Sequence, residues 1–195
     1  MLNEGVEIDI GIAFYNRCDD QGHLIVKSYT NPKNDRVRMS KSLVVEGKPT
    51  VYDDQPKQAM GKRAEVATCF YLNIDPEEYV NWDADGPDDG IDIRYDGWLI
   101  DTKGTLHKTG KYLIWPWSKR KFYHKRKMNT FVFGRQGNTK TSVQLLGWIE
   151  KDIFTEKHHV ANGTWPPNIV KGTWYMGAGE LNKMRYLCPK QPALF

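Results

Sequence analysis

The chain has 195 residues, enough for one domain with a full hydrophobic core, and its net charge of +4 is small. No stretch is apolar enough for a transmembrane helix and no signal-peptide pattern opens the chain, so we expect a soluble, cytoplasmic protein without a membrane partner. Its three cysteines, Cys18, Cys69 and Cys188, are too widely spaced for a disulfide framework or for a zinc or iron–sulfur site.

The first fifty residues are predicted to be a β-rich extension. From Val6 to Phe14, apolar residues alternate with polar or small ones, and this period of two indicates a half-buried strand. We expect a returning strand over 23–29 and another over 37–46. The sequence therefore predicts an extension, residues 1–50, packed on a core of residues 51–195 in one compact domain, and a structural role for the extension.

A helix is predicted to begin at the Asp53-Asp54-Gln55-Pro56 segment, because a carboxylate caps a helix well and proline fits its first turn. Apolar residues then recur at helical spacing, in a stripe made of Ala59, Met60, Ala64, Ala67, Phe70 and Tyr71. Gly61 lies one turn before Glu65, and we expect its missing side chain to let the helix approach the sheet and aim Glu65 at a metal site. The alternative for Glu65 is an exposed helical glutamate.

A short strand is expected over 79–82, followed by an acidic loop from Asp83 to Gly90. The loop fails the EF-hand pattern for calcium, because Pro87 replaces the third ligand and Arg94 replaces the closing glutamate. We interpret it as an acidic approach to a site on the next strands.

The segment Asp89 to Lys103 predicts a β-hairpin with Asp96-Gly97 as its two-residue turn, since a type I′ turn needs positive φ at both positions. The turn fixes the register, so that Tyr95 faces Trp98 and Asp92 faces Asp101. Alternation along the strands then predicts a core face made of Ile91, Ile93, Tyr95, Trp98, Ile100 and Thr102. The other face would carry Asp92, Asp101 and Lys103 together.

Two carboxylates opposite each other on a sheet repel, so the Asp92 and Asp101 pair favours a bound cation. Mg²⁺ suits carboxylate oxygens and commonly binds through one or two carboxylates, water and substrate phosphate. Lys103 would add a positive charge able to hold an attacking water or to stabilise the transition state of phosphodiester hydrolysis. The alternative is a solvated hairpin face without a ligand.

These residues carry a resemblance. Asp92, a gap of eight residues and then Asp101-Thr102-Lys103 resembles the PD-(D/E)xK signature of restriction-endonuclease-like nucleases. The Gly61 to Glu65 segment resembles the helix that often supplies a glutamate in that superfamily. The resemblance covers residues 55–149, about half of the chain. It departs from the pattern at Pro87-Asp88, which spells "PD" but lies too far from the turn to face Asp101.

The resemblance implies an α/β fold with the αβββαβ core of that superfamily and a mixed central sheet. It implies a DNA nuclease in which Glu65, Asp92, Asp101 and Lys103 are catalytic. Glu65, Asp92, Asp101 and the Thr102 carbonyl would bind Mg²⁺, with Mn²⁺ as a substitute. We prefer Asp92 to Asp88 as the ligand and expect Asp89 to assist from outside the direct ligands.

Downstream, we expect a third strand over 112–115, a helix over 119–127 capped by Ser118, and strands over 131–133 and 142–149. A short helix over 152–158 and a late strand over 173–176 follow. The predicted 119–127 helix interleaves aromatic residues with cations, a composition that suits DNA backbone binding. Its expected DNA-binding residues are Lys119, Arg120, Lys121, Lys125, Arg126 and Lys127.

Charge is distributed unevenly along the chain. Residues 53–101 hold thirteen acidic and four basic side chains, whereas residues 102–149 hold eleven basic side chains and no acidic one. An acidic half that holds a cation beside a basic half that holds phosphates suits a nuclease. Three alternatives stay open: a solvated basic helix, a nucleic-acid-binding module with an inactive site, and an assembly protein stabilised by a cation on its acidic hairpin. A homodimer is also open, because two sites would cut both strands of a duplex.

Overall fold

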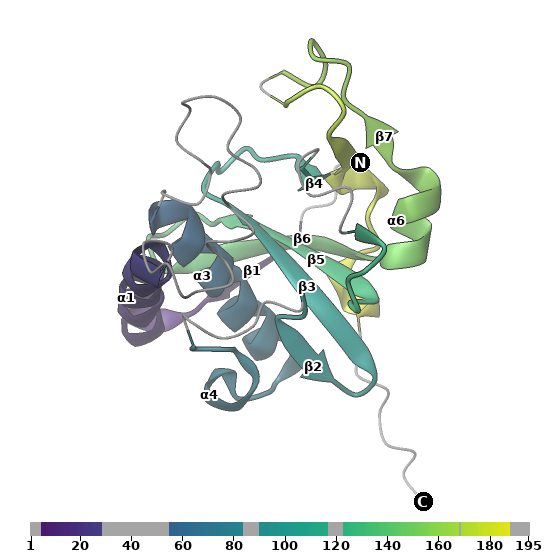
Figure 1. Ribbon diagram of the computed structural model, residues 1–195. Coiled ribbons are helices and arrows are strands. Elements are labelled where there is room, and N and C mark those ends of the chain that lie inside the picture. Colours follow the sequence, from purple (N-terminus) through teal and green to yellow (C-terminus); the bar gives the residue numbers. More distant parts are fainter. Residues whose placement is uncertain (1–4, 29–54, 84–89, 117–122, 168, 188–195) are drawn as a thin grey trace, which may run out of the picture.

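The computed structural model describes residues 5–28, 55–83, 90–116, 123–167 and 169–187 as an α/β protein with two sheets (Figure 1). Its helices and strands, in chain order, are β1 Val6–Asp9, α1 Gly11–Ser28, α3 Gln55–Leu72, α4 Pro76–Tyr79, β2 Ile93–Tyr95, β3 Trp98–Thr105, β4 Tyr112–Trp115, β5 Thr130–Gln136, β6 Ser142–Glu150, α6 Lys151–Lys157, β7 His159–Val160 and β8 Trp174–Gly177. Two short 3₁₀ turns, Ala178–Glu180 and Met184–Tyr186, follow.

The larger sheet has five strands in the order β1-β6-β5-β3-β2, and the smaller sheet has three in the order β4-β8-β7. The larger sheet is mixed, because β3 and β5 are parallel while the other neighbours are antiparallel. This confirms the predicted α/β class and mixed sheet. Among the described residues, no helix is both long and apolar enough to cross a membrane.

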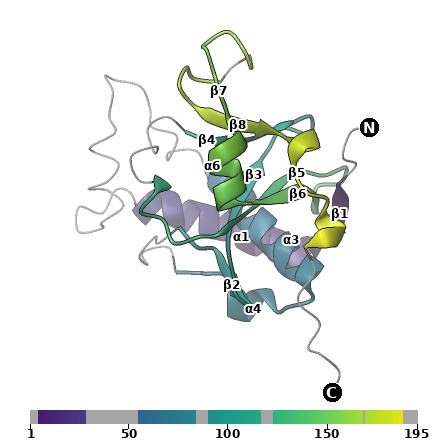
Figure 2. The ribbon, with the colours of Figure 1, turned by 90° about the vertical axis from the view of Figure 1, so that its right-hand side faces the viewer.

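Two hydrophobic clusters lie on opposite faces of the larger sheet. One joins α1 and α3 to the sheet through Met60, Ile100 and Val132. The other joins the smaller sheet and α6 to the opposite face through Trp115, Phe131 and other residues. Figure 1 shows α1 and α3 on the left of the molecule and α6 with the smaller sheet on the right, and in Figure 2 α6 faces the viewer with α1 behind it. The larger sheet is therefore covered on both faces, and a polar side chain on it is accessible only near an edge or a strand end.

The described part of the N-terminal extension is mainly helical, so its predicted β-rich character is wrong. Strand β1 ends at Asp9, whose carboxylate accepts a 2.9 Å hydrogen bond from the Gly11 N–H, and α1 starts there. Residues 23–28 belong to α1 and form no returning strand. The structure packs α1 tightly on α3, because a Cβ at Gly22 would lie 2.9 Å from the Gln55 carbonyl oxygen. The strand predicted over 37–46 lies outside the described residues.

Helix α3 begins at Gln55 as predicted, but Gly61 does not mediate its contact with the sheet. A Cβ added at Gly61 would meet nothing within 4 Å. The close approach occurs instead at Gly104 of β3, where a Cβ would lie 2.7 Å from the Met60 carbonyl oxygen. A glycine on the strand, not on the helix, therefore lets α3 sit against the larger sheet.

The strand predicted over 79–82 is wrong, because the helical turn α4 ends at Tyr79 and residues 80–82 are irregular. The Asp75 carboxylate caps α4 by accepting a 2.9 Å hydrogen bond from the Glu77 N–H, and Pro76 occupies the first turn. The hairpin of β2 and β3 is confirmed, with Asp96 and Gly97 both at positive φ in its turn and with the expected facing pairs next to that turn.

Most of the predicted downstream elements are confirmed, but two are placed differently. Strands β5, β6 and β8 and helix α6 form close to their predicted positions. Strand β4 also forms, but it pairs with β8 in the smaller sheet and so is not a third strand of the larger, central sheet. In the predicted 119–127 helix, the described Lys125, Arg126 and Lys127 are not helical, and residues 119–122 lie outside the described residues.

Candidate active site

The site lies where β2 leaves the larger sheet, and a β-bulge shapes it. The Asp92 N–H donates a 2.8 Å hydrogen bond to the Ile100 carbonyl, although Ile100 is already the ladder partner of Ile93. Two consecutive residues thus oppose one, which is the geometry of a bulge. The predicted common face of Ile91 and Ile93 is wrong, because Ile93 is buried on the α3 side and Ile91 packs against the cluster on the other side.

The bulge redirects Asp92. The prediction placed its side chain directly across the ladder from Asp101, but the ladder ends at the Ile93–Ile100 pair. Instead, Asp92 Oδ2 accepts a 2.6 Å hydrogen bond from the Thr102 N–H. The N–H and C=O of a strand residue point to the same side, so the Thr102 carbonyl also points to the edge that β2 has left. Asp92 is therefore held against the backbone beside Asp101.

Asp101 and Lys103 share one face of β3, as their spacing of two predicts. Asp101 is buried, with 4% of its surface exposed, and its carboxylate forms an ion pair with the Lys103 ammonium. The Lys103 side chain retains a third of its exposure, and its Nζ lies 5.5 Å from the centre of the Trp115 ring. Lys103 thus pairs with a buried carboxylate while part of its own side chain is exposed at the protein surface.

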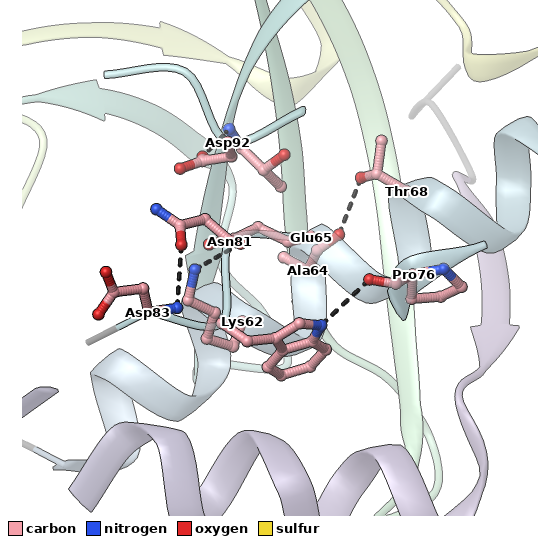
Figure 3. Close-up of polar contacts among 10 residues, drawn as sticks. Lys62, Ala64, Glu65, Thr68, Pro76, Asn81, Asp83 and Asp92 are labelled. Atoms are coloured by element: carbon pink, nitrogen blue, oxygen red, sulfur yellow. Dashed lines mark hydrogen bonds and ion pairs between the residues drawn. The ribbon is translucent and has the colours of Figure 1, made fainter. Parts of the chain in front are cut away.

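Glu65 projects from α3 into the same region and is buried, with 5% of its surface exposed, so the exposed alternative for it is wrong. Its carboxylate lies 2.7 Å from the Lys62 ammonium, one turn earlier on the helix. The pKa of Glu65 is raised from 4.5 to about 8, chiefly by burial; Lys62 lowers it, and the charges of Asp92 and Asp101 contribute to the rise. The three carboxylates are therefore close enough to interact electrostatically. Figure 3 shows Glu65, Lys62 and Asp92 together.

An open groove of about 380 Å³ leads to Asp92. It runs between the segment around α4 and the start of β2, and its lining residues are Glu78, Tyr79, Val80, Asn81, Ile91, Asp92 and Arg94. The Asn81 side-chain oxygen accepts a 2.9 Å hydrogen bond from the Asp83 N–H, as Figure 3 shows. The groove gives Asp92 access to solvent from the side of α4.

Of the six predicted DNA-binding residues, Lys119, Arg120 and Lys121 lie outside the described residues. The other three precede β5. Lys125 and Lys127 are exposed, and the Arg126 side chain lies against Gly90, where an added Cβ would be 2.5 Å from the Arg126 Cδ. Because Gly90 is two residues from Asp92, Arg126 brings a positive charge to the approach of the acidic site.

The donor atoms suit a hard divalent cation, since carboxylate and carbonyl oxygens are the ligands that Mg²⁺ prefers. Thr102 Oγ1 is also buried beside them without a hydrogen-bond partner. Across the described ranges, no three His, Cys, Asp or Glu side chains are already gathered at metal-binding distances, and the ion pairs of Asp101 with Lys103 and of Glu65 with Lys62 occupy two of the carboxylates. Metal binding by Asp101 and Glu65 therefore requires these ion pairs to open and their side chains to rotate.

Sequence reasoning missed two residues of this region. Lys62 had a readable signal, because a spacing of three on a helix places it on the same side as Glu65. The sequence contained no signal for Asn81, since this residue follows α4 in an irregular segment whose position depends on tertiary packing.

The chain matches no protein-family model, no curated protein and no solved structure. Its function therefore has to be argued from the chemistry of the site.

Proposed function

We propose that the protein is a metal-dependent DNA nuclease that hydrolyses phosphodiester bonds. The observation that carries this proposal is the gathering of three carboxylates and one lysine where β2 leaves β3. Asp92 is fixed against the Thr102 N–H at 2.6 Å, Asp101 is paired with Lys103, and both aspartates act electrostatically on Glu65. Lys62 and Lys103 balance only two of the three carboxylates, so a bound cation would compensate the remaining charge once all three are ionised.

In this proposal, Asp92 and Asp101 hold the cation, with Glu65 and the Thr102 carbonyl as further ligands. A bound Mg²⁺ would polarise the scissile phosphate and lower the pKa of a coordinated water. Lys103 would leave its ion pair with Asp101 once that carboxylate binds metal, and its ammonium would then orient the attacking water or neutralise developing negative charge. Its partial exposure allows it to reach a substrate at the surface.

The basic residues that precede β5 support DNA as the substrate. Lysine and arginine side chains that neutralise phosphates provide most of the sequence-independent affinity for DNA. Arg126 lies against Gly90, two residues before Asp92, and Lys125 and Lys127 are exposed beside it. A duplex held by these residues would place a phosphate near the carboxylates.

The test is a cleavage assay with Mg²⁺ or Mn²⁺ against EDTA, using supercoiled plasmid, linear duplex, single-stranded DNA and a four-way junction. We expect metal-dependent cutting by the wild type and its loss in Lys103→Ala. Lys157→Ala is the matched control, because Lys157 is exposed on α6, outside the site. Thermal melting of both variants would show whether each is folded.

Cutting that persists in a folded Lys103→Ala variant would contradict the assigned role of Lys103. DNA binding without cutting of any substrate, in either metal, would instead favour the alternative of a nucleic-acid-binding module with an inactive site. The preferred substrate would distinguish endonuclease, exonuclease and junction-resolving activities.

A further inference from the structure

The Lys62 and Glu65 ion pair is more enclosed than a helix-surface pair would be. The two charged atoms lie 2.7 Å apart, and the side chains are only 12% and 7% exposed. Lysine before glutamate is also the less favourable order for stabilising a helix through such a pair. Helix stability therefore does not explain why a lysine with only 12% of its side chain exposed lies at this position.

We propose that the Lys62 ammonium takes the place of a second divalent cation, so that the site binds one metal ion and not two. This inference rests on the proposed nuclease function. Two-metal sites clamp the attacking and leaving oxygens between cations that lie close together. Here the carboxylate on the α3 side of the cluster, Glu65, already has a cation at ion-pair distance. That cation belongs to the chain itself.

The charges of the site agree with this assignment. When Glu65 is ionised, as a metal ligand must be, Glu65, Asp92 and Asp101 carry three negative charges, and Lys62 and Lys103 carry two positive ones. One divalent cation would leave the group with a single positive charge, suited to one phosphate. A second divalent cation would lie beside Lys62 and be repelled by it, because like charges a few ångströms apart interact strongly away from water.

Lys62 is fixed beside Glu65 by the helix that carries both residues. It and Glu65 are on the same helix, so the pair moves with α3 as a unit and does not depend on a loop. Figure 3 shows the contact between them as a dashed line in the same view as Asp92. Lys62 therefore acts as a positioning residue that holds the Glu65 carboxylate and prevents it from recruiting a metal ion of its own.

The test counts bound Mn²⁺ by calorimetric titration of the full chain. We expect one Mn²⁺ in the wild type, one in Lys62→Arg, which keeps the charge, and two in Lys62→Met, which has a similar length and no charge. Lys57→Met is the control, because Lys57 is exposed in the first turn of α3 and should leave the count at one. The Mg²⁺ dependence of cleavage should become steeper only in Lys62→Met.

Electron paramagnetic resonance of Mn²⁺ in the wild type gives a second measurement, which holds even if Lys62→Met fails to fold. A mononuclear spectrum at saturating Mn²⁺ is expected, whereas a spin-coupled pair of ions in the wild type would overturn the inference. If a folded Lys62→Met variant still cleaves DNA and binds only one Mn²⁺, the inference about Lys62 is overturned and the nuclease proposal stands. A wild type that binds no Mn²⁺ and cleaves no DNA would overturn the nuclease proposal together with it.

Discussion

Replacing Glu65 with glutamine is expected to remove a pH dependence from the stability of the protein. The pKa of Glu65 is raised from 4.5 to about 8, chiefly by burial. In the unfolded chain the carboxyl ionises near its ordinary value, so between these two pKa values the folded state retains a proton that the unfolded state has released. The free energy of unfolding therefore falls as the pH rises from 4.5 to about 8, and Glu65 adds no slope outside this window.

The size of the effect follows from the shift. One pKa unit corresponds to about 1.4 kcal/mol, so the rise from 4.5 to about 8 amounts to about 5 kcal/mol across the window. Glutamine resembles the protonated acid and does not ionise. Glu65→Gln should therefore match the wild type near pH 5 and exceed its free energy of unfolding by several kcal/mol above pH 8.

The measurement is urea unfolding of both proteins in EDTA at intervals from pH 5 to pH 9. Glu156→Gln is a suitable control, because Glu156 is exposed on α6 and should leave the pH dependence unchanged. Parallel pH profiles for the wild type and Glu65→Gln would refute the reasoning. Adding Mg²⁺ should stabilise the wild type most at high pH, where Glu65 is ionised, because metal ligands must be deprotonated.

Three other sets of substitutions test the site and the fold. Asp101→Ala should abolish cleavage while DNA binding survives, and Mg²⁺-dependent cleavage by that purified variant would contradict the site. A second set replaces four basic residues with alanine: Lys119, Arg120, Lys125 and Arg126. Binding to every DNA sequence should weaken, and the slope of log K against log [salt] should become shallower by about 0.9 for each phosphate that is no longer neutralised. Filter binding over a range of salt concentrations measures both effects. Gly104→Ala should lower the free energy of unfolding by about 1 to 3 kcal/mol, because the added Cβ would lie 2.7 Å from the Met60 carbonyl oxygen. An unchanged midpoint of urea unfolding would contradict this, since it would show that α3 can shift without loss of stability.

The hairpin was predictable because its signals are local. Asp96-Gly97 determines the turn, and the turn determines the pairs beside it. Farther from the turn the predicted register is wrong, since the bulge at Asp92 adds a residue that strand alternation does not anticipate. The sequence therefore predicted that Asp101 and Lys103 share a face of β3, but not that Asp92 binds the Thr102 backbone instead of facing Asp101.

Helix α1 was mistaken for strands because its first residues continue the alternation of β1. Ile12 fits the period of two, yet it is 59% exposed. The helical stripe of Cys18, Gly22 and Ile25, which packs inward, was the competing signal. Tertiary packing against α3 decided between two patterns that a short window cannot distinguish.

Strand β4 was predicted correctly as a strand, but the expectation that it is the third strand of the central sheet is wrong. Its Leu113 and Trp115 are buried against the larger sheet, so its pattern is that of a half-buried strand in either sheet. The sheet to which β4 belongs is decided only by its pairing partner, β8, which lies about sixty residues later in the chain. Pairing between distant segments is the part of the fold that local patterns do not specify.

Strand β1 occupies one edge of the larger sheet. Its four residues pair with β6, whose nine residues are almost all buried. Glu7 fastens it, because the Glu7 carboxylate accepts hydrogen bonds from the Ser142 hydroxyl and the Asn138 N–H. A chain shortened to begin at Ile10 would leave a long apolar strand edge unpaired, and such edges recruit strands from other molecules. Strand β1 thus protects this edge of the larger sheet from pairing with strands of other molecules.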